Sequence, residues 1–113
     1  APLTAEVLFP RVDAIVAAMK TGSVITVDHA VKTLAGIAST STERNAAIFP
    51  VLLEHLWKCR AKEVPQHAES TLVAVTPGNR VDFIGMLLSR QEEFTAPQAA
   101  RVRRVIKRAE QIA

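Results

Sequence analysis

Two side chains that can bind a metal ion, His55 and Cys59, stand four residues apart. On a helix this spacing places both on one face, where an imidazole nitrogen and a thiolate sulfur are suitable zinc ligands. Two ligands do not make a site, and the chain contains neither a Cys-x-x-Cys nor a His-x-x-x-His motif to supply more. Cys59 also continues a run of apolar residues at helical spacing, where a thiol behaves as a small hydrophobic group. The sequence therefore predicts a core or surface role for this pair, with no metal and no cofactor.

A few other residues invite a functional interpretation. His29 and His67 occupy the same place in two similar segments, each directly before an Ala. A position shared between repeats predicts a shared structural role, such as a cap or a hydrogen bond between repeats; a ligand or pH-sensing role is the alternative. Glu92 and Glu93 are neighbours near a helix end, where adjacent side chains point apart, so we expect a solvated corner. Trp57 lies one step off an apolar stripe, which predicts a packed boundary residue, with an interface anchor as the alternative.

The motifs of common enzyme classes are missing from the sequence. There is no Gly-x-Ser-x-Gly nucleophile elbow. The four Gly residues are isolated from one another, so they cannot build a glycine-rich phosphate loop. We therefore predict that the chain is not an enzyme.

Positive charge is concentrated in the last segment of the chain. Residues 95–113 hold five Lys/Arg and one Glu, a net charge of +4, whereas residues 1–94 hold nine Lys/Arg and ten Asp/Glu, a net charge of −1. An Arg side chain suits a carboxylate or a phosphate because its planar fork donates two hydrogen bonds. Three interpretations stay open: a solvated cap at the end of a repeat stack, a site for an acidic partner, and a nucleic-acid site. The candidate binding residues are Arg101, Arg103, Arg104, Lys107 and Arg108.

The composition is that of one small globular domain. Of the 113 residues, 49% are apolar and 22% are charged, which excludes a disordered chain. Ala and Leu are abundant and Tyr is absent, which favours helices. No apolar run approaches the roughly 18 residues that span a bilayer, so we expect no membrane segment. The single Cys59 cannot form an internal disulfide, which favours a reducing, cytoplasmic compartment.

Hydrophobic periodicity and Pro or Gly breaks predict six helices. They cover about residues 3–20, 25–38, 42–60, 65–75, 80–90 and 96–112. Thr40 and Glu43 have capping-box spacing ahead of the third helix, and Pro50 should kink that helix or break it near Phe49. The sixth helix is expected to start after Thr95. Its predicted buried stripe consists of Val102, Val105, Ile106, Ala109 and Ile112.

Short segments repeat along the chain. Phe9-Pro10 recurs as Phe49-Pro50 at an offset of 40, and residues 29–34 (HAVKTL) recur as 67–72 (HAESTL) at an offset of 38. A third echo, of residues 12–15 in 81–84, opens a shorter unit. A two-helix unit of this length cannot bury its apolar stripe alone, so neighbouring units must stack. The sequence therefore predicts one all-α domain over residues 1–113, built from antiparallel pairs at about 3–38, 42–75 and 80–112.

The second unit resembles a HEAT repeat. Residues 50–56 (PVLLEHL), followed by Val64, Ala68 and Leu72, match the Pro-x-Leu-Leu-x-x-Leu and Val-x-x-x-Ala-x-x-x-Leu patterns of that family. The third unit is similar by its helix pattern alone. The family's usual Asp in the turn is absent here, and its usual Arg after the Val is Pro65, so HEAT-like or armadillo-like is the label we use. In the first unit the matching residues are Pro10, Ile15, Ala30 and Leu34.

The resemblance implies a fold and a class of function. Proteins of this type form right-handed α-α superhelices whose second helices line the concave face, and most are protein-interaction scaffolds, although some bind nucleic acid and a DNA glycosylase group exists. We therefore expect a non-enzymatic module that binds a protein or peptide, an acidic partner being one candidate. Nucleic-acid binding through the basic last helix is the alternative, and a DNA-repair glycosylase-like enzyme is the least favoured. Self-association through the first helix, or extension into a longer solenoid, stays open.

Overall fold

The computed structural model describes residues 12–21 and 24–112, and within these ranges it is all-α, with no strand. The α-helices are α2 (Val12–Thr21), α3 (Val24–Ala38), α4 (Thr42–Lys58), α5 (Val64–Thr71), α6 (Arg80–Ser89) and α7 (Ala96–Glu110). Short 3-10 turns follow as η2 (Ala61–Glu63), η3 (Leu72–Ala74) and η4 (Gln91–Glu93). The all-α prediction is confirmed. Phe9-Pro10 and the predicted start of the first helix lie outside the described residues.

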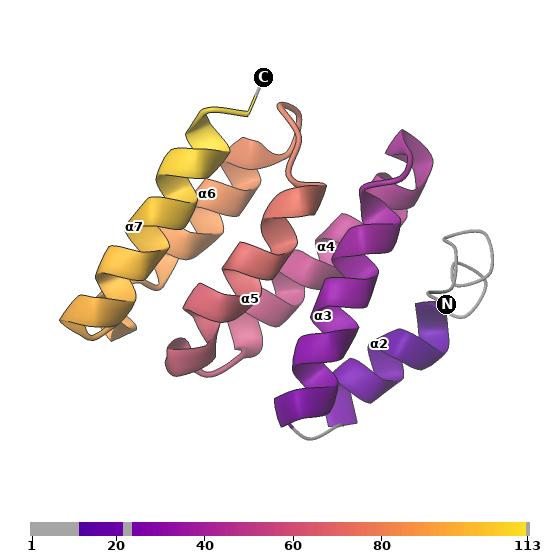
Figure 1. Cartoon of the computed structure of the whole chain (residues 1–113), viewed down its shortest axis with the longest axis horizontal. Helices are drawn as coiled ribbons and strands as arrows, with labels where there is room; N and C mark the ends of the chain where they lie inside the picture. The colour runs from indigo at the N-terminus through magenta and orange to yellow at the C-terminus, as the bar shows by residue number, and fades with distance from the viewer. Residues whose placement is uncertain (1–11, 22–23, 113) are drawn as a thin grey trace.

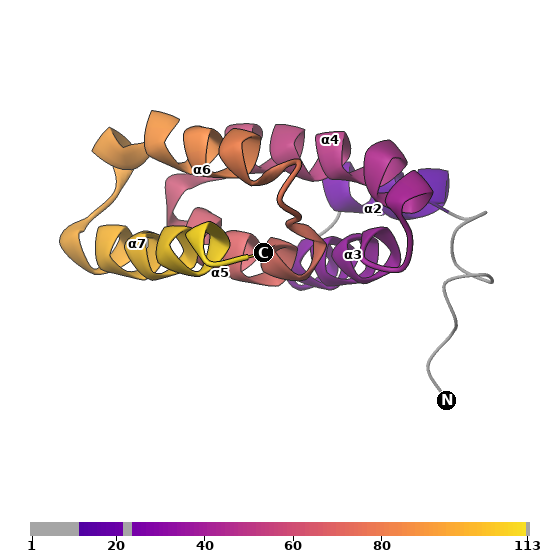
Figure 2. The ribbon, with the colours of Figure 1, turned by 90° about the horizontal axis from the view of Figure 1, so that it is seen from above.

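The helices form two layers. α3, α5 and α7 lie side by side in one layer, and α4 and α6 lie side by side in the other (Figure 1, Figure 2). α2 crosses α3 obliquely at the N-terminal end of the arrangement (Figure 1). Each helix also contacts its partner in the chain, so that α2 packs on α3, α4 on α5, and α6 on α7. α3 also packs on α4, so the helices contact one another within these pairs and between them.

The hydrophobic core lies between the two layers. Apolar side chains from α3, α4, α5, α6 and α7 meet there, and Phe49 of α4 packs against Phe83 of α6 with ring centroids 6.3 Å apart. On α7 the predicted stripe is observed: Val102, Val105 and Ala109 are buried. Its two flanking members, Ile106 and Ile112, are half-buried against the core. The apolar spacing of each helix thus decides which face it turns inward.

α4 runs through Pro50 without a break, so the predicted break near Phe49 is not found. A proline at this place removes the hydrogen bond to the carbonyl of Ala46. Pro50 and Ala46 are both exposed, so water can bond to that carbonyl instead. The buried neighbours Ile48, Phe49 and Leu52 hold the two halves of the helix against the core.

The helix starts are capped by side chains, although one cap differs from the prediction. Ser41, and not Thr40, caps α4, with its Oγ accepting a hydrogen bond from the Arg44 N–H at 3.1 Å. The predicted box of Thr40 with Glu43 is therefore wrong by one residue, because the Thr40 hydroxyl donates to the carbonyl of Ile37 at the end of α3. α7 starts as predicted after Thr95, which forms a capping box with Gln98.

An asparagine pair ties the second helix pair to the third. Asn79, at the start of α6, donates to the Asn45 side chain of α4 at 3.0 Å, and both Asn side chains donate to the carbonyl of Ala74. Asn79 Oδ1 also accepts from the Thr76 N–H at 2.7 Å. These bonds fix the turn between η3 and α6.

Among residues 12–21 and 24–112, no helix combines the length and the apolar character that crossing a membrane requires.

Candidate functional site

The predicted basic residues all lie on α7, but they are not equivalent. Arg101 is half-buried and forms a two-pronged ion pair with Glu69 of α5, with N–O distances of 2.8 and 2.6 Å. The other four, Arg103, Arg104, Lys107 and Arg108, are exposed and form no ion pair with any residue in the described ranges. Four of the five predicted residues therefore remain available to a partner.

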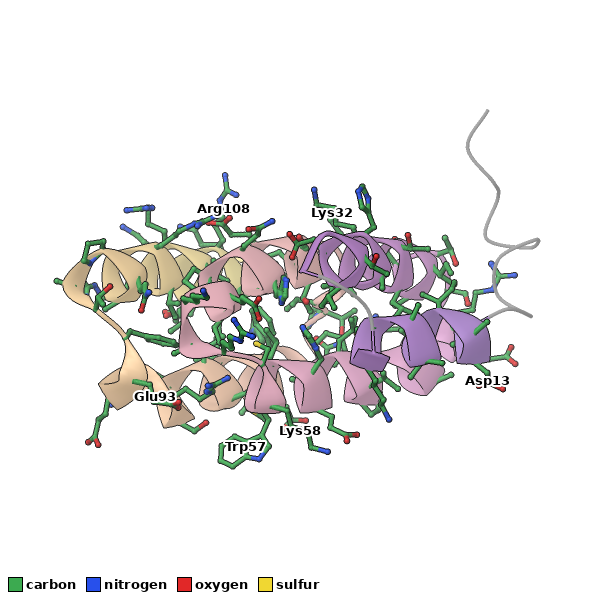
Figure 3. The ribbon with its side chains drawn as sticks, turned by 90° about the horizontal axis from the view of Figure 1, so that it is seen from below. Asp13, Lys32, Trp57, Lys58, Glu93 and Arg108 are labelled. Carbon is green, nitrogen blue, oxygen red and sulfur yellow. The ribbon has the colours of Figure 1, made fainter. Side chains whose placement is uncertain are left out.

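The charges of α7 also act on its neighbour. The pKa of Glu69 is lowered, first by its hydrogen bonds with Arg101 and then by the nearby charges of Arg101, Arg104 and Arg108. Arg104 and Arg108 thus lie on the side of α7 that faces α5. Arg108 projects outward from the layer of α3, α5 and α7, on the same side as Lys32 (Figure 3).

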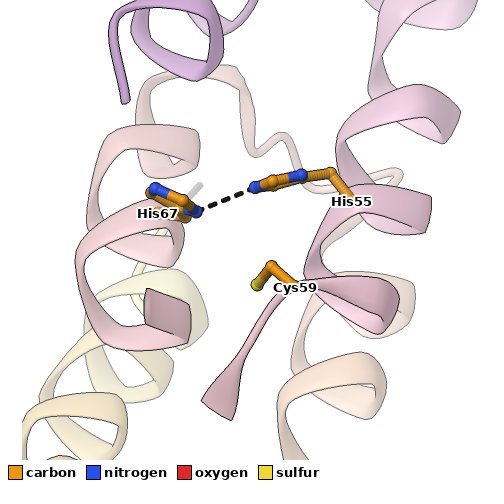
Figure 4. Close-up of side chains that lie close together, drawn as sticks. All are labelled: His55, Cys59 and His67. Atoms are coloured by element: carbon orange, nitrogen blue, oxygen red, sulfur yellow. Dashed lines mark hydrogen bonds between the residues drawn. The ribbon is translucent and has the colours of Figure 1, made fainter. Parts of the chain in front are cut away.

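A second cluster was not expected from the sequence. His55 of α4 and His67 of α5 face each other, with His55 Nε2 lying 2.8 Å from His67 Nδ1 (Figure 4). The possible ligand atoms of His55, His67 and Cys59 all lie within 4.8 Å of one another. On its other side, His67 Nε2 bonds to the carboxylate of Asp28 on α3.

The hydrogen bonds of the cluster assign a tautomer to each neutral imidazole. A carboxylate only accepts, so His67 Nε2 donates to Asp28, and Nδ1 of the neutral His67 ring then accepts from the His55 Nε2–H. Gln66 donates to the other oxygen of Asp28 at 3.0 Å. His67 is only 1% exposed, and this chain of bonds satisfies it. His55 therefore donates to His67, and His67 donates to Asp28.

Burial keeps the other two members of the cluster uncharged. Burial, with a further contribution from His67, lowers the pKa of His55 to about 4, although Asp28 acts in the opposite direction. Burial also raises the pKa of Cys59 to about 11, against the opposing charge of Arg90. At neutral pH the pair is a neutral imidazole and a thiol. A Cys-His catalytic dyad acts through a thiolate, which the raised pKa of Cys59 disfavours.

Arg90 holds the end of α4, where Cys59 is the C-terminal cap. Arg90 is 7% exposed, and its Nη1 donates to the carbonyls of Leu56 at 2.8 Å and Cys59 at 2.5 Å. Its other nitrogens pair with Glu93 at 2.8 and 2.9 Å. Glu93 is therefore an ion-pair partner, and both Glu92 and Glu93 are exposed, as the predicted solvated corner requires.

The cluster opens into a cavity beside α2. This cavity has a volume of about 300 Å³ and reaches His55 and Cys59 from outside. An ion pair of Lys58 with Glu54, at 2.6 Å, lies at its edge. The lining residues are Met19, Lys20, Val51, Glu54, His55, Lys58 and Cys59.

Sequence reasoning found His55 and Cys59 but missed the partners on other helices. His67 and Asp28 stand 39 residues apart, close to the repeat offset of 38, which is the signal that could have placed them side by side. His67 makes the predicted kind of hydrogen bond between helix pairs, to Asp28, but His29 does not share this role, because His29 is exposed while His67 is buried. The surroundings of the two residues differ. His67 is on α5, which packs against both α3 and α4, whereas His29 is on α3, the first helix of its layer in the described chain.

Trp57 is 55% exposed and projects from the layer of α4 and α6, away from Arg108 (Figure 3).

No protein-family model, curated protein or solved structure matches the chain, so its function has to be argued from the basic face of α7 and the cluster around His67.

Proposed function

We propose that the chain is a HEAT-like, armadillo-type repeat module that binds an acidic segment of a partner protein through the basic face of α7 and performs no catalysis. We define the basic face as Arg103, Arg104, Lys107 and Arg108. The observation that carries the proposal is that these four cations are exposed on one helix and have no ionic partner in the described ranges.

The assignment to a repeat stack, and with it a right-handed superhelix, draws support from the links within one layer. Asp28 of α3 bonds to His67 of α5, and Glu69 of α5 bonds to Arg101 of α7. His67 and Arg101 occupy matching places at the offset of 34 that relates the buried stripes of α5 and α7. In each case the residue at this place binds a carboxylate from the preceding helix of its layer, which is typical of stacked repeats.

A solvated end cap explains the basic face less well. A cap needs polar side chains of either sign, whereas the basic face pairs like charges at i,i+4, Arg103 with Lys107 and Arg104 with Arg108. Each such pair costs a helix about 0.2–0.5 kcal/mol. On α4 the same spacing joins opposite charges, Glu54 and Lys58. The repulsion between the like charges of α7 favours binding of an acidic ligand, which would relieve it.

An acidic protein segment is a better candidate than nucleic acid. Binding of single strands relies on aromatic side chains that stack on the bases. Among the described residues, Trp57 is the exposed aromatic side chain, and it lies on the opposite layer from Arg108 (Figure 3). The basic face therefore offers charge without a stacking platform, which suits carboxylates.

Fluorescence anisotropy tests the proposal with two labelled probes: a peptide of about ten glutamates and a mixed-sequence DNA duplex of about twenty base pairs, both at low salt. The basic-face variant replaces Arg103, Arg104, Lys107 and Arg108 by Gln. A charge-matched control replaces Lys20, Lys58, Arg60 and Lys62 by Gln, all of which are exposed.

We expect the peptide to bind the wild type and the control alike, and the basic-face variant at least about tenfold more weakly. Peptide affinity should fall as salt rises. A duplex that binds more tightly than the peptide, with a log–log salt slope near −4, would establish the nucleic-acid alternative. Equal binding by both variants, or no peptide binding at low salt, refutes the proposal.

A further inference from the structure

We propose that His55 Nε2, His67 Nδ1 and Cys59 Sγ bind a zinc ion, with a fourth coordination position that opens into the cavity beside α2. The sequence argued against a metal here because it offered two ligands only. α5 supplies the third, so that three groups of the class zinc prefers, two imidazoles and a thiol, lie within 4.8 Å of one another. This site is separate from the basic face of α7.

The distances require small shifts to accommodate the ion. Zinc binds nitrogen at about 2.0–2.1 Å and sulfur at about 2.3 Å, so tetrahedral angles put the two nitrogens about 3.3 Å apart and nitrogen and sulfur about 3.5 Å apart. His55 Nε2 and His67 Nδ1 lie 2.8 Å apart and need to separate by roughly 0.5 Å. Cys59 caps the end of α4, where a rotation of its side chain can bring the sulfur closer.

The surroundings of His67 are those of a metal ligand. Histidines that bind metals usually donate their other ring N–H to a carboxylate, which fixes the tautomer and aims the free lone pair. Asp28 does this for His67, and Gln66 holds the second oxygen of Asp28. The lone pair of His67 Nδ1 therefore points at His55 Nε2, and the Cys59 side chain lies close to that line (Figure 4).

Cys59 has no strong partner that would compete with a metal. Its sulfur has two contacts of 3.9 Å, with the Leu56 carbonyl and with Nη1 of Arg90. Both are weak for a thiol. Arg90 donates a hydrogen bond to the backbone carbonyl of Cys59. It therefore holds Cys59 near the imidazoles and leaves the sulfur able to bind a metal.

The proton balance of binding follows from these groups. The hydrogen of His55 Nε2 moves to Nδ1, so that the imidazole stays neutral and Nε2 presents a lone pair. Cys59 loses its thiol proton and binds as a thiolate, so each zinc ion releases one proton from the protein. A water molecule in the cavity takes the fourth position, an arrangement that leaves the ion open to an external ligand.

The donor set selects the type of metal. Nitrogen and sulfur ligands suit zinc and its cobalt(II) substitute, whereas magnesium and calcium need oxygen ligands. Cobalt(II) is the useful probe, because a thiolate ligand gives a charge-transfer band and tetrahedral geometry gives intense visible bands.

The test uses the full chain freed of metal with a chelator. Cobalt(II) and then zinc are titrated and followed by absorption, and zinc binding is measured by calorimetry in buffers of different ionisation enthalpy. The variants are Cys59→Ala, His55→Gln and Asp28→Asn, and none of the three residues is fully buried. His29→Gln is the matched control, because His29 is exposed and lies outside the cluster. Circular dichroism verifies that each variant folds, and Cys59→Ser replaces Cys59→Ala if the latter does not.

We expect one zinc ion per chain with a Kd at or below about 1 µM, a cobalt–thiolate band and release of one proton. Cys59→Ala should lose the band and at least about 100-fold in affinity. His55→Gln should lose a similar factor in affinity, because it too removes a ligand, and Asp28→Asn should lose about 10- to 100-fold. His29→Gln should match the wild type. The inference is overturned if no cobalt–thiolate band forms, or if Cys59→Ala binds zinc as the control does.

Discussion

Replacement of Arg90 should strongly destabilise the folded chain, because this side chain joins the ends of two helices. It stands at the end of α6, and its guanidinium reaches the end of α4, where it bonds to the carbonyls of Leu56 and Cys59. We consider Arg90→Met, because methionine keeps an unbranched apolar stem in the same space but cannot donate a hydrogen bond.

The magnitude follows from two lost hydrogen bonds. A hydrogen bond from a charged donor contributes about 1.5–3 kcal/mol, and a buried carbonyl left without a partner carries the cost of its desolvation. Leu56 is fully buried, so water cannot replace Arg90 there. The Cys59 carbonyl, near the cavity, is easier to solvate. We expect Arg90→Met to lower the free energy of unfolding by about 3–4 kcal/mol.

Urea unfolding followed by circular dichroism measures this change. For a chain of this length the loss corresponds to a fall in Tm of roughly 15 °C, with an unfolding entropy near 2.1 cal/mol/K per residue. Arg103→Met is the matched control, because Arg103 is exposed and unpaired in the described chain, and it should change stability by less than about 0.5 kcal/mol. If Arg90→Met were as stable as this control, the hydrogen bonds to α4 would not be holding its end.

Three further predictions concern other parts of the molecule. Glu69→Gln releases Arg101 from its ion pair and should raise affinity for the glutamate peptide about threefold in the anisotropy assay; weaker binding would count against the role of the basic face. In metal-free protein the folded pKa of His55, about 4, is below the unfolded value near 6.5, so the unfolded chain binds the proton first and stability should fall as pH drops from 7 toward 4. Allowing for partial exposure, urea titrations should give a loss of roughly 2 kcal/mol that His55→Gln removes; an unchanged pH profile in this variant would exclude His55 as the cause. Asn79→Ala breaks the bonds to Asn45 and to the carbonyl of Ala74 and should cost about 1–2 kcal/mol in the same assay, whereas wild-type stability would show that these bonds contribute nothing net.

The helices were predictable because their signals are local. The apolar spacing of α7 and the cap at Thr95 fix that helix and its buried face without reference to the rest of the chain. Pro50 shows the limit of local reasoning. Its penalty of about 3 kcal/mol in a helix interior predicts a break, but burial of Phe49 and Leu52 on either side outweighs it. Packing decided that element, and packing is not visible in a segment alone.

The cluster around His67 could not be predicted in the same way. His55 and Cys59 are near in sequence, and their shared helix face was evident, but His67 and Asp28 arrive from two other helices. Their meeting depends on how α3, α4 and α5 are stacked. Only the repeat offset contained that information, and it pointed to His29 as the equivalent of His67, although the residue that matters on α3 is its neighbour Asp28.

The stacking also explains why a metal site arises in the second helix pair and not in the third. His67 and Arg101 take matching places, and each binds a carboxylate of the preceding helix, Asp28 or Glu69. A guanidinium has donors only, so Arg101 donates its hydrogen bonds to that carboxylate and cannot bind a cation. An imidazole has a second nitrogen, and once Asp28 fixes the proton on Nε2 of His67, a lone pair remains on Nδ1. At this position an Arg only links two helices. A His links the two helices and also presents a metal-binding nitrogen toward His55. Replacing His67 by Arg should keep the link to Asp28 and abolish the cobalt–thiolate band, and a band that survived this change would remove His67 from the proposed metal site.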